Sequence, residues 1–155
     1  MPKIDIGKAP VRTTTVYPDE FKDVCKGREK AALGNLVGLT QFGVNLTRLK
    51  PGAASALRHW HHNEDEFIYV LEGELVLVED ASEVLLKAGD AAGFKAGVPN
   101  GHQLINKSDR DAVYLEMGSR ASSEHVEYPD VDLVVIRRED GKFSLNHKSG
   151  EPYRS

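Results

Sequence analysis

Three histidines lie within four consecutive positions, in the run His59-Trp60-His61-His62, and this clustering calls for a chemical explanation. In a β-strand the side chains of residues i and i+2 point to the same face. His59 and His61 can therefore converge on one point, while Trp60 and His62 face the other way. Imidazole nitrogens are good ligands for divalent transition metals. The spacing predicts a metal site on a strand that contains His59 and His61.

A carboxylate and a third imidazole can complete this site. After the polar turn at 63–65, Glu66 opens a second strand, which is expected to run antiparallel beside the first and return its carboxylate to the same point. His102 is expected to arrive from a distant strand. Three imidazole nitrogens and one carboxylate oxygen suit one divalent transition metal ion (Fe, Mn, Ni, Cu or Zn) and leave positions open for water or substrate. We therefore expect a reactive metal centre held by His59, His61, Glu66 and His102.

Other polar residues near this run are not expected to take part in the site. His62 is expected to face solvent, although a one-residue shift of strand register would exchange it for His61. Arg58 could reach a substrate carboxylate, but a surface position is the favoured interpretation, and Lys95 is equally ambiguous. No role is assigned to the two histidines of the C-terminal region, which lack ligand spacing: His125 and His147.

The segment 36–118 must supply the strands that position the site. It consists of short apolar runs separated by Gly, Pro, Asn and Asp at regular intervals, which is an all-β pattern. Strands of this length and spacing favour a sandwich or a barrel. They are expected at 42–47, 67–71, 75–78, 84–86, 91–94, 103–105 and 112–117.

The alternation within these strands predicts which faces are buried. Phe42 and Val44 alternate with polar neighbours, so one face of their strand is expected to be buried. Residues 67–71 and 75–78 are apolar on both faces and are joined by Glu72-Gly73-Glu74. They are expected to form a hairpin that is covered by a second layer or by a partner subunit. The pocket lining is expected to be partly apolar and to include Phe42, Val44, Ile68 and Leu104.

The flanks differ from this central region. Residues 20–26 are expected to form the one short helix, capped by Asp19, with Cys25 as a small buried apolar residue on it. At the other end, residues 131–137 and 143–145 are expected to form a hairpin arm that docks on the barrel or on a partner. The whole chain is then one domain in three segments: an N-terminal extension at 1–35, the barrel at 36–120 and the C-terminal arm at 121–155.

Composition excludes several classes of function. The chain has 155 residues, 40% of them hydrophobic and 28% charged, as expected for one soluble globular domain. The apolar runs are far shorter than the ~20 residues of a membrane-spanning helix, and the N-terminus lacks the pattern of a signal peptide, so a cytoplasmic location is expected. The net charge is −4 and basic residues do not cluster, which argues against a nucleic-acid partner.

Two motifs resemble those of the cupin superfamily, and in particular small single-domain bacterial cupins. The first motif matches Gly52, His59-Trp60-His61, Glu66 and Gly73, and the second matches Gly89, Gly97, His102 and Asn106. This resemblance implies a double-stranded β-helix, also called a jelly roll or cupin barrel. It further implies a metal ion in the mouth of the barrel and a homodimer.

The second motif departs from the usual cupin pattern at two points. Lys95 stands where the pattern has proline, and His102 comes two residues later than expected, so strict spacing would place Asn100 at the metal. A shift of two residues preserves strand parity, which allows His102 to face inward. Imidazole also binds borderline ions far better than an amide does, so His102 is the favoured ligand.

Three functions are compatible with such a site, because one fold can host several chemistries. The first expectation is a metal-dependent, dioxygenase-like enzyme that acts on a small organic molecule. The alternative is a non-redox isomerase, decarboxylase or lyase, with Glu66 as the catalytic proton-transfer residue. The third is a non-catalytic cupin that binds or senses a small molecule.

Overall fold

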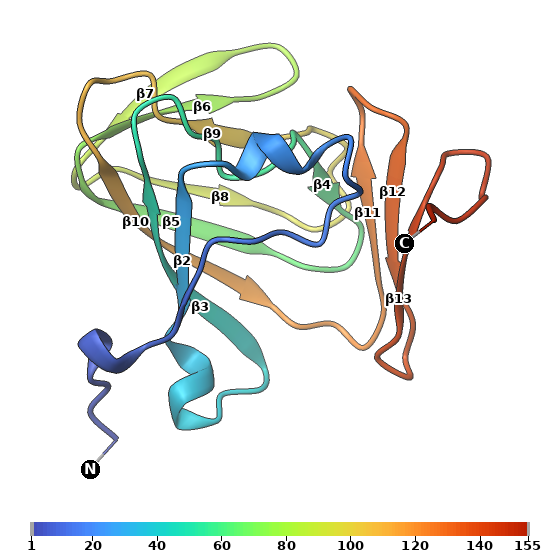
Figure 1. The fold of residues 1–155 in the computed structure, drawn as a ribbon, viewed down its shortest axis with the longest axis horizontal. Helices are drawn as coiled ribbons and strands as arrows, with labels where there is room; N and C mark the ends of the chain where they lie inside the picture. Colours follow the sequence, from blue (N-terminus) through green and yellow to red (C-terminus); the bar gives the residue numbers. More distant parts are fainter. Residues whose placement is uncertain (1, 155) are drawn as a thin grey trace.

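The computed structural model describes residues 2–154 as an all-β protein in which every strand pair is antiparallel (Figure 1). A six-stranded sheet has the order β1-β2-β3-β10-β5-β8, and a three-stranded sheet has the order β7-β6-β9. Their strands are β1 (Val11–Arg12), β2 (Arg28–Ala32), β3 (Phe42–Leu49), β5 (Glu66–Glu72), β6 (Glu74–Val78), β7 (Glu83–Lys87), β8 (Ala91–Phe94), β9 (Gln103–Ile105) and β10 (Ala112–Ser119).

The main core lies between these two sheets. The six-stranded sheet contributes Leu49, Val70 and Tyr114, and the three-stranded sheet contributes Leu75 and Leu104. Four of these side chains are completely buried, and Leu104 is 3% exposed. The burial of apolar surface between the facing sheets is the main force that stabilises the fold.

The predicted hairpin between residues 67–71 and 75–78 is wrong. β5 pairs with β10 and β8, whereas β6 pairs with β7 and β9, so the two strands belong to different sheets. Gly73 makes the corner between them with a φ of +73°, and a Cβ atom there would lie 2.6 Å from the Asp111 carbonyl oxygen. Only glycine combines this backbone conformation with so close an approach.

The buried face of β3 is the opposite of the face suggested by its apolar residues. Thr47 is completely buried and the Asn45 side chain points inward to Glu116, whereas Phe42 is 45% exposed. The expectation that Phe42 and Val44 line the pocket is therefore wrong. The space between the sheets holds a polar site, so polar side chains point inward on this strand.

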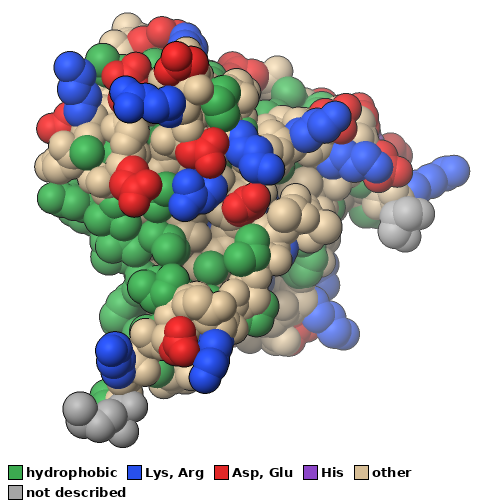
Figure 2. All heavy atoms as spheres, turned by 60° about the vertical axis from the view of Figure 1, so that its left-hand side comes forward, with side chains coloured by type: hydrophobic (Ala, Val, Ile, Leu, Met, Phe, Trp, Pro, Cys, Tyr) green, Lys and Arg blue, Asp and Glu red, His purple; other side chains and the backbone are tan. Residues whose placement is uncertain are grey.

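The outer face of the six-stranded sheet carries exposed apolar side chains. Phe42, Phe67, Tyr69 and Leu71 are each between 39% and 45% exposed. Further along this face, the N-terminal segment packs on Leu46 and Leu115. Figure 2 shows hydrophobic side chains gathered above the N-terminal segment, with most of the charged residues elsewhere on that view.

The predicted N-terminal helix is shortened to a single 3-10 turn, η2 (Lys22–Cys25). Asp19 does not cap it; its carboxylate instead contacts Lys22 Nζ at 3.2 Å. Because β2 starts directly after Gly27, pairing with β3 takes up the chain before a longer helix can form. Cys25 is buried, as predicted. The other helical segments, η1 (Ile6–Lys8) and η3 (Gly34–Val37), are equally short, and no helix in residues 2–154 could cross a membrane.

The predicted C-terminal hairpin is confirmed and joins a larger sheet. β12 (Leu133–Arg137) pairs with β13 (Phe143–Asn146) and also with β11 (Glu124–Tyr128), which in turn pairs with β4 (Trp60–His61). This four-stranded sheet stands at the right of the other two sheets in Figure 1. The arm is therefore hydrogen-bonded to the short strand that contains His61, one of the predicted metal ligands.

Candidate metal centre

Backbone pairing brings the four predicted ligands together. His61 lies on β4, and His59 immediately precedes this strand. His59 N donates to His102 O at 3.1 Å and His102 N donates to His59 O at 2.9 Å, so the distant His102 is fixed beside His59. Glu66 is the first residue of β5 and reaches the cluster from the six-stranded sheet.

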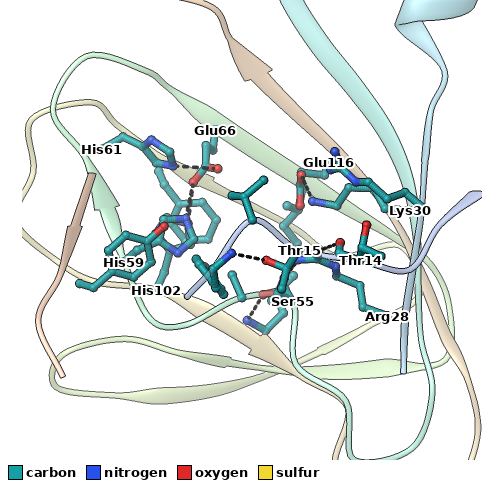
Figure 3. A pocket seen from close by; sticks show the side chains of 18 residues that line it. Thr14, Thr15, Arg28, Lys30, Ser55, His59, His61, Glu66, His102 and Glu116 are labelled. Atoms are coloured by element: carbon teal, nitrogen blue, oxygen red, sulfur yellow. Dashed lines mark hydrogen bonds and ion pairs between the residues drawn. The ribbon is translucent and has the colours of Figure 1, made fainter. Parts of the chain in front are cut away.

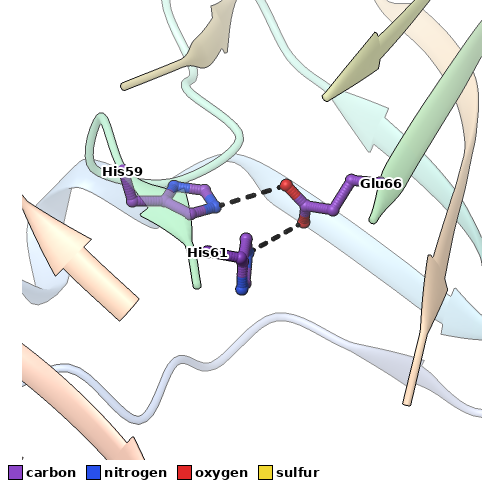
Figure 4. Close-up of side chains that lie close together, drawn as sticks. All are labelled: His59, His61 and Glu66. Carbon is purple, nitrogen blue, oxygen red and sulfur yellow. Dashed lines mark ion pairs between the residues drawn. The ribbon is translucent and has the colours of Figure 1, made fainter. Parts of the chain in front are cut away.

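The ligand atoms meet around the Glu66 carboxylate (Figure 4). His61 Nε2 lies 3.2 Å from Oε1, while His59 Nε2 and His102 Nε2 lie 3.8 Å and 2.7 Å from Oε2. One ligand atom from each of His59, His61 and Glu66 lies within 4.8 Å of the others, which is close enough to hold a metal ion. His102 contacts Glu66 at the edge of this group.

The orientation of two imidazoles favours metal binding through Nε2. His59 Nδ1 lies 2.7 Å from the Leu57 carbonyl oxygen, which can only accept, so Nδ1 carries the proton and Nε2 keeps its lone pair. His61 Nδ1 faces a carboxylate oxygen of Glu124 at 3.5 Å. Such partners of the second ring nitrogen fix the tautomer of histidines that ligate metals.

Unpartnered buried atoms show that the cluster fits a cation. His61 Nε2 and Glu66 Oε2 are buried and make no hydrogen bond of good geometry. Burial raises the pKa of Glu66, but the three neighbouring imidazoles lower it well below its ordinary value. The carboxylate is thus ionised. A divalent ion with nitrogen and oxygen ligands would satisfy these atoms together.

His102, and not Asn100, faces the cluster. The Asn100 side chain accepts a hydrogen bond from the Asp80 backbone N at 3.0 Å and is engaged in the loop outside. The His102 ring stacks on Phe94, with ring centres 3.6 Å apart and planes inclined by 4°. Burial lowers the pKa of His102, and the nearby charges do not offset this, so its ring is neutral and able to ligate.

Arg58 and Lys95 do not point to a substrate. Arg58 forms a bidentate pair with Asp130, with both distances 2.8 Å, and also contacts Asp80. It therefore connects loops next to His59. Its side chain is only 13% exposed, so it is largely buried and not on the surface as expected. Lys95 is exposed at the end of β8.

His62 points away from the predicted centre and meets a second group. His125 Nε2 and His62 Nε2 lie 2.9 Å and 3.6 Å from Glu127 Oε1, and both histidines are more than a third exposed. A third group of possible ligands comprises His61, Glu64 and Glu124. Its carboxylates already have partners, because Glu64 pairs with Arg137 and Glu124 accepts two backbone N–H groups.

The predicted ligands line one end of a cavity of about 330 Å³. Ile68 and Leu104 line it as expected, whereas Arg28, Lys30 and Glu116 were not predicted. Figure 3 shows these three at the end away from the histidines. Glu116 could have been suspected from the sequence, since it is the only charged residue within the predicted strand 112–117.

Comparisons with known proteins identify the family. The Cupin domain family matches residues 45–118. A solved structure from Silicibacter pomeroyi, described as a sugar phosphate isomerase from a cupin superfamily, is 44% identical, with 99% of this chain and 98% of that chain covered and a TM-score of 0.94. The chain belongs to the cupin superfamily.

Two further proteins resemble this cupin more distantly. A solved structure from Acidithiobacillus ferrooxidans, assigned provisionally as a sugar phosphate isomerase, is 27% identical, with 96% and 90% of the two chains covered and a TM-score of 0.78. An oxalate-binding protein from Thermotoga maritima is 26% identical over 110 residues, which are 68% of this chain and 88% of that protein.

Proposed function

We propose that this cupin is a metal-dependent isomerase that acts on a small phosphorylated sugar without a redox step. One observation carries the proposal: the same pocket holds a metal-capable cluster and, outside that cluster, a second carboxylate, Glu116. The full-length similarity to the Silicibacter pomeroyi protein supports this substrate class. We interpret the two facing sheets as a double-stranded β-helix whose interior contains the pocket.

Glu116 has the surroundings of a proton-transfer group. Its Oε1 atom accepts hydrogen bonds from Lys30 Nζ at 3.0 Å and from Asn45 Nδ2 at 3.1 Å. Burial raises the pKa of the Glu116 carboxyl, but the Lys30 charge and these two hydrogen bonds outweigh burial, so the pKa lies below its ordinary value. The carboxylate is therefore ionised at neutral pH and can accept a proton.

Interconversion of an aldose and a ketose moves one proton between neighbouring carbons and one between the attached oxygens. A metal ion at His59, His61, Glu66 and His102 would supply Lewis acidity toward these oxygens. Glu116 takes the carbon-bound proton, the C–H electron pair forms the carbon–carbon double bond, and the carbonyl π pair moves to its oxygen. The neighbouring hydroxyl passes its proton to that oxygen and becomes the new carbonyl as Glu116 returns the proton to the adjacent carbon. Lys30 stabilises the ionised form of Glu116. The substrate keeps all its electrons, so no oxidant is consumed.

The expectation of an oxygenase has weaker support. Nitrogen and oxygen ligands alone are compatible with iron and dioxygen chemistry. The two relatives with full-length similarity are both described as isomerases, and the pocket provides a carboxylate suited to proton transfer. We therefore favour the non-redox alternative and move the acid–base role from the predicted Glu66 to Glu116, with Glu66 as a metal ligand.

The proposal is tested by incubating the metal-loaded protein in D₂O with a panel of pentose and hexose phosphates. Turnover is followed by NMR. We expect isomer formation with deuterium from solvent at the carbon that receives the proton, at equal rates with and without dioxygen. Glu116→Gln is expected to lower kcat by about 100-fold or more at unchanged metal content, because it removes the base. Glu72→Gln, outside the pocket on β5, is the matched control. A dependence on dioxygen, or a fully active Glu116→Gln variant, would contradict the proposal.

Binding of a small carboxylate without turnover is the second candidate function. It is favoured by the similarity to the Thermotoga maritima oxalate-binding protein. Calorimetric titration of the metal-loaded protein with oxalate distinguishes the two functions. Tight oxalate binding, together with no change in any sugar phosphate of the panel, would select the binding function.

A further inference from the structure

Arg28 is a buried cation without a counter-charge. It is 6% exposed and projects from β2. Its Nη1 donates to the Ser55 carbonyl oxygen at 2.7 Å, and its Nη2 donates to the Thr14 carbonyl oxygen at 3.1 Å. The Nε atom is buried and has no hydrogen-bond partner. Among residues 2–154, no carboxylate forms an ion pair with this guanidinium.

Other partly buried cations of this chain are paired. Lys30, two residues further along the same strand, contacts Glu116 at 3.0 Å, and Arg58 contacts Asp130 at 2.8 Å. Proteins rarely bury a charge without a partner, because removal of an ion from water is costly. Two carbonyl dipoles do not neutralise Arg28. A bound anion would supply the missing charge and accept the free N–H groups.

The position of Arg28 within the cavity indicates which part of a ligand it would meet. In Figure 3, Arg28 and Thr14 lie at the end away from His59 and His61. Arg12 also lines the cavity and adds a second positive charge. The carboxylates that line the cavity are offset, since Glu116 is paired with Lys30 and Glu66 is surrounded by imidazoles.

We propose that Arg28 binds the phosphate group of the substrate, so that the carbonyl end of the sugar faces the metal cluster. This inference rests on the proposed function and deepens it. The guanidinium is planar and presents parallel N–H donors that match two oxygens of a phosphate. A cavity of about 330 Å³ is at the small end of ligand sites, which suits a short phosphorylated sugar.

Binding of inorganic phosphate to the metal-free protein, measured by calorimetry, tests this inference independently of turnover. Arg28→Gln is expected to weaken phosphate binding by about tenfold or more, because it removes charge-assisted hydrogen bonds. Arg48→Gln, which alters an exposed arginine paired with Asp111 on the same sheet, is expected to leave it unchanged. Equal phosphate affinity of wild type and Arg28→Gln would overturn the inference.

Two additional measurements complete the test. If Arg28→Gln does not fold, Arg28→Lys retains the charge but lacks the planar donors, and is expected to bind phosphate more weakly than wild type. Acetate and oxalate are titrated in parallel; a tighter Arg28-dependent binding of either would overturn the phosphate assignment. If the phosphate result is positive and no sugar phosphate is isomerised, the anion site stands and only the isomerase proposal fails.

Discussion

The buried carboxylate of Glu124 faces one predicted metal ligand, His61. Its Oε2 atom faces His61 Nδ1 at 3.5 Å, while its Oε1 atom accepts hydrogen bonds from the backbone N–H groups of Asn63 and His125 at 2.9 Å and 2.7 Å. Glu124 is only 5% exposed. The two backbone contacts fix the carboxylate beside the imidazole. Oε2 and Nδ1 make no hydrogen bond of good geometry, so the carboxylate acts on the ring through its negative charge.

Glu124→Gln is expected to lower metal affinity by about 10-fold to 100-fold. The glutamine oxygen can still accept from the backbone, which leaves its NH₂ group facing His61 Nδ1. His61 would then carry its proton on Nε2, where it blocks ligation. Titration against a competing chelator measures the effect. Glu72→Gln, an exposed residue on β5 outside the groups of possible ligands, is the control, and equal affinity of both variants would show that Glu124 does not orient His61.

The sequence predicted the residues at the cluster better than those at the opposite end of the pocket. His59 and His61 were recognisable because strand parity and motif spacing agree on them. Arg28 was not recognisable, because it lies in a segment expected to be an extension, and its proposed role depends on the missing counter-charge. An absent ion pair is a property of the folded environment and leaves no pattern in the chain.

At the scale of elements, the sequence located most strands but not the partners of β5 and β6. Alternation and length identify a strand locally, whereas pairing depends on the direction in which the chain leaves the strand. Gly73 turns the chain into the other sheet, and its neighbours resemble an ordinary hairpin turn. The inward face of β3 could not be inferred either. Its polar side chains point inward because a polar site lies there, and the position of that site is known only from the fold.

Gly73→Ala is expected to destabilise the protein more than Gly52→Ala. Both residues have positive φ, of +73° and +84°, so each alanine bears a conformational cost of about 1–2 kcal/mol. Only the Cβ atom at position 73 would collide with a backbone oxygen, that of Asp111, and this adds at least about 1 kcal/mol. Urea denaturation measures the difference. Equal losses in the free energy of unfolding would mean that the close approach at the corner is unimportant.

At the scale of the whole molecule, the exposed apolar face of the six-stranded sheet is suited to self-association. Phe67, Tyr69 and Leu71 on β5 point away from the core and remain about 40% exposed. The sequence showed that β5 is apolar on both faces, which predicted a covering layer or a partner subunit. Within residues 2–154, the N-terminal segment covers only the neighbourhood of Leu46 and Leu115.

We expect a homodimer with two-fold symmetry through this face, because such dimers are common and extended apolar patches are usually covered. Tyr69→Glu is expected to convert the dimer to a monomer, as measured by light scattering, since it buries a charge in the interface. Leu85→Glu alters an equally exposed apolar residue on β7 and should leave the dimer intact. A monomeric wild-type protein would refute the expectation.

Isomerase activity as a function of bound metal tests the central claim most directly. Metal-free protein is reloaded with increasing amounts of a divalent ion, and both the metal content and the rate of sugar phosphate isomerisation are measured without dioxygen. The proposed function predicts a rate that rises in proportion to occupancy and reaches a plateau at one ion per chain. Full activity in the metal-free protein, or no isomerisation at full occupancy, would contradict it.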